Sequence, residues 1–164
     1  MLAVKQDDET FVFEDVASAP IPSLLRGFSC PVRLEYEYTD AELALLMAHD
    51  TDSFQRWEAG QRLAMRVLER GVAAYRAGRV DDAFVDDAYV EAMRALLVSA
   101  VHGDPALVAE AMSLPSEVVI AEATPGEVDP DAIHHARLTL RRTLASRLGD
   151  ELAQAYARLA TVEP

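Results

Sequence analysis

Repeated helix-start signals divide most of this chain into short segments. Thr39-Asp40-Ala41-Glu42 has the pattern of a capping box, in which the threonine and glutamate side chains each accept a hydrogen bond from a backbone N–H group. Asp104-Pro105 and Asp129-Pro130 each place a capping carboxylate before a proline, which fits the first position of a helix. These signals predict separate helices from residue 39 onward, so the fold is expected to be mainly α.

Apolar residues recur at helical spacing between these signals. We expect helices over about residues 39–49, 52–76, 88–101, 105–112, 115–124 and 130–159, the last one kinked or split at Gly149-Asp150. The second helix is apolar on two sides, with Trp57 and Tyr75 on one of them, so we expect it to lie between neighbouring helices. Antiparallel helices with short links predict an irregular α-solenoid-like stack. No clean sequence period identifies a named repeat.

The N-terminal part of the chain has a different pattern. Short apolar runs rich in β-forming residues occur at residues 2–4 and 11–13, and residues 32–36 alternate between apolar and polar. We expect three strands there, with an extended connector around Pro20 and Pro22. Three strands are few for a stable sheet. We therefore expect them either to pack on the helices or to end a β domain that begins outside this chain.

Composition argues against several classes of function. Asp and Glu number 28 against 15 Lys and Arg, which gives a formal net charge of −13. Nucleic-acid phosphates require clustered positive charge, which an acidic chain does not offer. Cys30 is the only cysteine, so no intramolecular disulfide can form. No stretch resembles a signal peptide or a membrane span, and we expect a soluble, cytoplasmic protein that binds neither nucleic acid nor membrane.

The four histidines do not have the spacing of a metal site. His49 and His102 fall at predicted helix C-termini, where a charged imidazole favours the helix dipole. His134 and His135 lie in a first helical turn, where Asp131 and His135 could chelate a metal, but no third ligand is evident. We expect no metal or cofactor site in this chain.

Other candidates for chemistry have structural interpretations. Cys30 has no neighbouring base or cation to activate its thiol, so we expect a buried structural cysteine. Asp81-Asp82 and Asp86-Asp87 resemble paired acid and base carboxylates, but a loop and a helix cap favour solvated turn residues. Arg141-Arg142 is expected on a solvated helix face. We therefore assign no catalytic, cofactor-binding or metal-binding residue to this chain.

The boundary between the predicted strands and helices carries a family resemblance. Thr10-Phe11-Val12-Phe13, the run from Pro22 to Leu34 (PSLLRGFSCPVRL) and the run from Asp52 to Gln61 (DSFQRWEAGQ) resemble passages of bacterial aminopeptidase N, in the same order. Further matching stretches are Asp104 to Leu107, Leu114 to Ser116, Thr143 to Ala145 and Asp150 to Leu152. On these residues the sequence is identified as similar to the zinc-dependent alanyl aminopeptidases of gluzincin type.

The resemblance implies a parent protein several times longer than this chain. Such a parent has an N-terminal β domain, a thermolysin-like catalytic domain, a small β-sandwich and a C-terminal helical domain that covers the active site. Residues 1–38 would be the last strands of the β-sandwich with a linker, and residues 39–164 the first part of the helical domain. Zinc would polarise the carbonyl of an N-terminal peptide bond while a glutamate activates water. No residue of this chain matches a zinc-binding or catalytic residue of the family, so we expect an inactive fragment.

The role that the resemblance implies is structural. The segment would link and cover the catalytic domain of its own parent protein, whose substrates are peptides. The alternative is a stand-alone helical module for protein–protein interaction, indicated by the solenoid-like pattern alone. The reading frame upstream of Leu2 separates the two, because only an aminopeptidase parent predicts a continuous frame that encodes His-Glu-x-x-His. Unpaired strand edges also predict that a fragment can self-associate.

Overall fold

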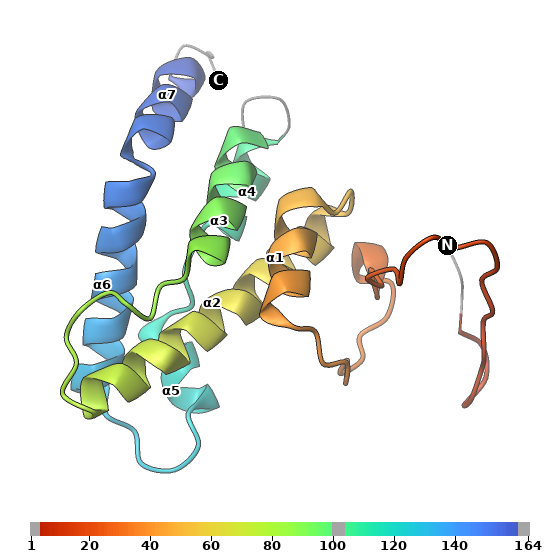
Figure 1. The fold of residues 1–164 in the computed structure, drawn as a ribbon, viewed down its shortest axis with the longest axis horizontal. Helices are drawn as coiled ribbons and strands as arrows, with labels where there is room; N and C mark the ends of the chain where they lie inside the picture. Colours follow the sequence, from red (N-terminus) through yellow and green to blue (C-terminus); the bar gives the residue numbers. More distant parts are fainter. Residues whose placement is uncertain (1–3, 100–103, 161–164) are drawn as a thin grey trace.

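The computed structural model describes residues 4–99 and 104–160. Within these residues, the regular secondary structure is helical (Figure 1). The elements are η1 (Arg26–Phe28), α1 (Asp40–His49), α2 (Ser53–Arg76), α3 (Asp87–Ser99), α4 (Pro105–Ala111), α5 (Glu117–Ala123), α6 (Pro130–Arg147) and α7 (Gly149–Leu159). The prediction of a mainly α fold is confirmed. No helix within the described ranges combines the length and the apolar character needed to cross a bilayer.

The helices begin at the residues that the capping signals indicated. At the start of α1, the backbone N–H of Glu42 donates to Thr39 Oγ1 at 3.2 Å, and that of Thr39 donates to Glu42 Oε2 at 2.7 Å. This is the predicted capping box. The other side chains that cap a helix start are Asp52 for α2, Asp86 for α3, Asp104 for α4, Ser116 for α5 and Asp129 for α6. Local sequence therefore sets where the helices start.

The predicted split of the last helix occurs at Leu148. This residue has φ −116° and ψ 15°, outside helical geometry, and it separates α6 from α7. Figure 1 shows α7 continuing beyond α6 after a bend. The Leu148 side chain is buried in the core, so the break directs an apolar side chain inward between the two helices.

Helix α2 lies between several neighbours, as its two apolar sides predicted. It packs against α1 and α6, and it also contacts α4 and α5. Leu63, Val67 and Leu68 on α2 are fully buried. Trp57 and Tyr75 are partly buried against the same core. A helix covered in this way is the expected centre of a helical stack.

Gly71 of α2 lies close to Ala136 of α6 and to the ring of Phe84. A Cβ atom on Gly71 would lie 2.8 Å from the Phe84 ring and 2.9 Å from the Cβ of Ala136. These distances are too short for carbon atoms that are not bonded, so this position requires glycine. Gly60, on the same helix, differs, because a Cβ there would lie 3.6 Å from the nearest atoms of Met47.

Arginine side chains on α2 connect the starts of α1 and α3. Arg66 and Arg70 each lie 2.7 Å from a carboxylate oxygen of Asp40, and Arg70 also lies 2.6 Å from Asp86 Oδ2. Burial acts to raise the pKa of Asp40, but the hydrogen bonds and charges of Arg66 and Arg70 outweigh it and lower that pKa. The ion pairs therefore keep Asp40 ionised at the first turn of α1.

The N-terminal part does not form the predicted strands. Residues 11–13 and 32–36 are irregular backbone, so these two strand predictions are wrong for the described structure, and the prediction for residues 2–4 lies mostly outside the described residues. A strand requires a neighbour that pairs with its N–H and C=O groups, and the described residues supply no such neighbour. Val12 and Phe13 remain 80% and 65% exposed. In Figure 1 this part lies to one side of the helices.

Candidate functional site

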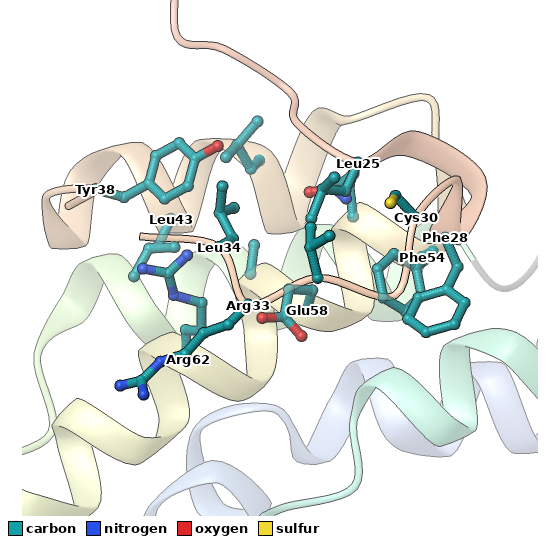
Figure 2. Close-up of a pocket in the computed structure, with 14 residues that line it drawn as sticks. Leu25, Phe28, Cys30, Arg33, Leu34, Tyr38, Leu43, Phe54, Glu58 and Arg62 are labelled. Carbon is teal, nitrogen blue, oxygen red and sulfur yellow. The ribbon is translucent and has the colours of Figure 1, made fainter. Parts of the chain in front are cut away.

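A cavity of about 380 Å³ lies where residues 25–34 cross helices α1 and α2 (Figure 2). Leu25, Phe28 and Leu34 line it from the crossing segment. Leu43 lines it from α1, and Phe54 from α2. Most of these side chains are apolar, which is typical of a site that accepts an apolar group.

Arg26 attaches the crossing segment to the connection between α1 and α2. Its Nη1 atom donates to Asp50 Oδ1 at 2.8 Å and to Ser23 Oγ at 3.0 Å. Its Nη2 atom donates to Thr51 Oγ1 at 2.8 Å. The side chain of Asp50 is only 2% exposed, so this ion pair is largely removed from water on the carboxylate side. Breaking such a pair leaves a buried charge without its partner.

The environment of Asp50 favours its ionised form. Burial acts to raise the pKa of this carboxyl group. The Ser23 side chain and the Asp52 N–H, which lies 2.8 Å from Asp50 Oδ1, stabilise the carboxylate. The positive charge of Arg26 adds to this, and the pKa of Asp50 falls below its ordinary value. Asp50 is therefore ionised near neutral pH, as an ion pair with Arg26 requires.

Asp52 serves the helix and the crossing segment together. Its Oδ1 atom accepts from the backbone N–H of Gln55 at 3.0 Å and so caps α2. Its Oδ2 atom accepts from the backbone N–H of Gly27 at 2.9 Å. One carboxylate thus connects the start of a helix with a turn that lies 25 residues away in the sequence.

The turn at residues 25–28 has an uncommon backbone conformation. Leu25, Gly27 and Phe28 have φ values of 56°, 64° and 51°. Glycine adopts such angles freely, but for other residues the left-handed region costs about 1–2 kcal/mol each. The Phe28 ring packs on the Phe54 ring with centroids 5.1 Å apart, as the side chains in Figure 2 show. This contact and the bonds of Arg26 stabilise the turn against that cost.

A second set of contacts attaches the C-terminal end of the crossing segment. The hydroxyl of Tyr38 donates to the carbonyl oxygen of Pro22 at 2.7 Å. Arg62 on α2 donates to the carbonyl oxygen of Tyr36 at 2.7 Å, and its guanidinium lies 5.2 Å from the centre of the Tyr38 ring. Burial is the largest of the effects that raise the pKa of Tyr38. Residues 22–38, called the strap below, are therefore tied to the helices at both ends.

Cys30 is exposed, so the prediction of a buried cysteine is wrong. The prediction rested on the absence of a neighbouring base or cation that would activate the thiol. The turn that precedes Cys30 follows the surface of α2, and its apolar contact with the helix is made by Phe28. Cys30 lines one edge of the cavity without being covered.

The histidines considered as metal ligands have other contacts. His134 Nδ1 lies 2.9 Å from Glu117 Oε1 on α5, and the ring of His135 packs on Tyr75 at a centroid distance of 4.8 Å. Within residues 4–99 and 104–160, no group of three or more His, Cys, Asp and Glu side chains is arranged to bind a metal ion. His49 ends α1 as expected, and His102 lies outside the described residues.

The acidic pairs occupy turns and caps, in agreement with their sequence interpretation. Asp82 accepts from Thr143 Oγ1 at 3.1 Å, and the backbone N–H of Ala83 donates to Asp81 Oδ1 at 3.1 Å. Asp86 caps α3, and Asp87 lies 2.7 Å from Arg147. These carboxylates therefore connect α3, α6 and the loop between α2 and α3. Arg141 and Arg142 are exposed on α6, as expected.

A second cavity of about 700 Å³ lies between α2, the connection from α4 to α5, and α5. Trp57 and Met65 line it from α2, and Leu114 lines it from the connection between α4 and α5. Glu58 and Arg62 line both cavities, so the two hollows meet at these residues. Together they form one surface that extends from the strap to α5.

The attachment through Arg26 was missed by the sequence analysis. Asp50-Thr51-Asp52 offers more capping side chains than the start of one helix needs, since Asp52 alone caps α2. That surplus was the available signal, because an extra carboxylate at a helix connection suggests a distant cationic partner. The identity of the partner could not be deduced, since 24 residues separate Arg26 from Asp50.

Profiles of two families match consecutive parts of the chain. Residues 40–164 match a domain of unknown function with ARM repeats (DUF3458_C). Residues 1–37 match a domain of unknown function with an Ig-like fold (DUF3458). The helical stack described above is the arrangement that ARM repeats form. The chain belongs to the DUF3458_C family.

Individual relatives agree on a more specific class. The chain is 42% identical over 156 residues to Aminopeptidase N of Escherichia coli, covering 95% of this chain and 18% of that protein. It is 36% identical over 163 residues to Aminopeptidase N of Caulobacter vibrioides, covering 97% of this chain and 18% of that protein. The resemblance to aminopeptidase N is confirmed.

A solved structure shares the fold. Legionella pneumophila aminopeptidase A, in complex with aspartic acid, matches with a TM-score of 0.74 and 28% sequence identity. The match covers 93% of this chain and 17% of that chain. The chain thus spans less than about a fifth of the length of the relatives that it matches, and it corresponds to a helical part of these aminopeptidases.

Proposed function

We propose that this chain is a non-catalytic segment of a zinc aminopeptidase that removes N-terminal amino acids from peptides. The observation that carries the proposal is the alignment of 95% of the chain, at 42% identity, with 18% of a protein named Aminopeptidase N. Zinc and the catalytic residues would belong to another part of the parent protein. The role of this segment is to connect and support the domain that covers the active site.

The proposed division of the chain follows from the same alignment. Residues 1–38 would be the terminal strands of an Ig-like β-sandwich with a linker, and residues 39–164 the first part of the helical domain. The family profiles, which match residues 1–37 and 40–164, support a boundary near residue 38. The strap lies beside this boundary and attaches one part to the other through Arg26 and Tyr38.

Charged side chains of the helical part support a structural role. Asp40 and Asp86 bind arginines of α2, and Arg94 binds Glu151 across α3 and α7. Two of these pairs connect α2 with the neighbouring helices α1 and α3, and the third connects α3 with α7. Because the side chains are partly exposed, each pair orients the helices and adds only a little stability. The partner of the segment would be the catalytic domain of the same polypeptide, and peptides would be substrates of the parent. The compartment would be the cytoplasm, which suits a chain with a single cysteine.

The gene and the purified chain test this proposal together. We expect the reading frame to continue upstream of residue 1 and to encode His-Glu-x-x-His. We also expect the 164-residue chain to contain no stoichiometric zinc by elemental analysis and to release no p-nitroaniline from alanyl-p-nitroanilide. An immediate upstream stop would contradict the proposal and favour a stand-alone module for protein–protein interaction. Zinc-dependent hydrolysis by the chain itself would also contradict it.

Self-association of the separate chain is a further expectation of the same proposal. Val12, Phe13 and Val32 are exposed here, whereas a completed β-sandwich would cover such residues. Sedimentation velocity at increasing concentration should show oligomers that disappear when residues 1–20 are removed. A strictly monomeric chain would contradict the expectation.

A further inference from the structure

The turn of the strap is unfavourable for the residues that form it. Leu25 and Phe28 both adopt positive φ, at 56° and 51°, although neither is a glycine. Bulky residues avoid this region because the Cβ atom approaches the backbone too closely. Such a conformation persists only where surrounding contacts determine it. The turn is therefore maintained from outside, and it would relax if those contacts were lost.

The contacts that maintain the turn converge on one target. Arg26 donates to Asp50 and Thr51, each at 2.8 Å, and the Gly27 N–H donates to Asp52 at 2.9 Å. All three acceptors belong to the short connection between α1 and α2. A turn held by three hydrogen bonds to consecutive residues has a defined direction as well as a defined position.

The connection that accepts these bonds is itself fixed. The backbone N–H of Asp50 donates to the carbonyl oxygen of Leu46 at 2.9 Å, and Asp52 caps α2. Arg56 on α2 donates to the carbonyl oxygen of Met47 at 3.1 Å, which joins the end of α1 to the start of α2. The helical side of the contact is therefore fixed by hydrogen bonds to α1 and α2.

The N-terminal side of the turn has few other attachments. Residues 10–20 are all exposed, while Ile21 and Leu24 are partly buried against the core. Pro22 also accepts a hydrogen bond from the Tyr38 hydroxyl at 2.7 Å. A change of φ at Leu25 or Phe28 therefore redirects the N-terminal side, in the manner of a hinge, when this bond and the packing of Ile21 and Leu24 are released with it. The turn thus lies within the Ig-like match, at the place where this part of the chain contacts the α1–α2 connection.

We propose that Arg26 and the Gly27 N–H, with their three acceptors on the α1–α2 connection, form a latch that helps to set the direction in which residues 1–24 leave the helical stack. In the latched state Leu25 and Phe28 are kept at positive φ. In the released state they return to ordinary backbone angles, and the N-terminal part turns away. The proposal concerns contacts within this chain and does not depend on the aminopeptidase assignment.

Amide hydrogen exchange tests whether Arg26 maintains the turn. In Arg26→Ala, we expect exchange of residues 25–29 to be at least about tenfold faster, with unchanged exchange in α2 and α6. Arg33→Ala is the matched control, because it removes an exposed arginine of the same strap for which no hydrogen bond is recorded. Unchanged exchange at residues 25–29 in Arg26→Ala would overturn the proposal. Faster exchange throughout the helices would also overturn it, since Arg26 would then support the whole fold.

A distance measurement tests whether the turn sets direction. The distance is measured between spin labels at two exposed positions, Ala19→Cys on the N-terminal side and Arg142→Cys on α6, in a Cys30→Ser background. We expect one narrow distance distribution in this background and in Arg33→Ala, and a broad distribution in Arg26→Ala. Equal distributions in Arg26→Ala and Arg33→Ala would overturn the proposal, as would a broad distribution before Arg26 is changed. A residue that merely stabilised the helices would not move this distance.

Discussion

The helical part and the N-terminal part of this chain contain apolar residues of the same kinds but bury them to very different extents. Met47 and Leu68 in the helices are 0% exposed, whereas Val12 and Phe13 are 80% and 65% exposed. Helices complete their backbone hydrogen bonds within one segment, but strands need a neighbouring strand. The difference teaches that the described residues contain packing partners for the helices and no neighbour that pairs with residues 11–13 or 32–36.

Truncation of an apolar side chain should give the largest difference in stability between the two parts. Leu68→Ala removes a fully buried side chain, and we expect the free energy of unfolding to fall by about 2–5 kcal/mol. Phe13→Ala removes a larger but mostly exposed side chain, and we expect a change below about 0.5 kcal/mol. Urea unfolding followed by circular dichroism measures both. Equal losses would show that residue 13 is packed and would break the comparison.

The contact at Gly71 should give the next largest effect. Gly71→Ala places a methyl group against Phe84 and Ala136, and we expect a loss of about 1–3 kcal/mol. Gly60→Ala is the control on the same helix, because its nearest neighbour lies at an ordinary distance of 3.6 Å. Since alanine favours helix over glycine by about 1 kcal/mol, Gly60→Ala should be neutral or stabilising in urea unfolding. Similar losses at both glycines would contradict the close approach of α2 and α6.

A smaller effect is expected at the first helix cap. Thr39→Ala removes one half of the capping box of α1, and we expect a loss of about 1 kcal/mol. Thr10→Ala makes the same change at an exposed position without regular structure, and should leave the thermal midpoint unchanged. If Thr10→Ala cost as much as Thr39→Ala, the N-terminal part would contain more structure than the comparison allows.

Acid should weaken the helical part through Asp40 and Asp50. The pKa of each is below its ordinary value of 3.8 in the folded chain. As the pH falls below 3.8, the unfolded state binds more protons than the folded state at these two groups. Their contribution to the free energy of unfolding is therefore fully present above pH 3.8 and is lost as the pH falls through the folded pKa values. Urea unfolding between pH 5 and about pH 2 should show this decline, reduced in Asp50→Asn. If the free energy of unfolding of Asp50→Asn declined with pH as steeply as that of the unchanged chain, Asp50 would not be a source of the decline.

Sequence predicted the helices because their determinants are local. The capping box at residues 39–42 and the aspartate before Pro130 are read within one turn of helix, and both were located correctly. The break at Leu148, next to the predicted Gly149-Asp150, is local in the same way. By contrast, the pairing of Arg26 with Asp50 depends on the tertiary fold, and no rule based on residue spacing predicts it. The exposure of Cys30 likewise depends on which side of the turn faces α2.

The predicted strands failed for a related reason. Residues 32–36 alternate correctly for a strand, and the family profile with an Ig-like fold includes them. Alternation reports which face a strand would bury, but pairing requires a second strand at about 4.8 Å. The sequence pattern therefore describes a structure that this chain cannot complete with its own described residues.

Hydrogen exchange of the same residues in two contexts tests the central claim most directly. Exchange by mass spectrometry should be compared between the 164-residue chain and the longer parent protein that we propose. We predict that amides of residues 11–16 and 32–36 exchange rapidly in the chain and become strongly protected in the longer protein, while those of α2 are protected equally in both. Equal exchange of residues 11–16 and 32–36 in the two proteins would contradict the claim that their strand partners lie elsewhere in the parent.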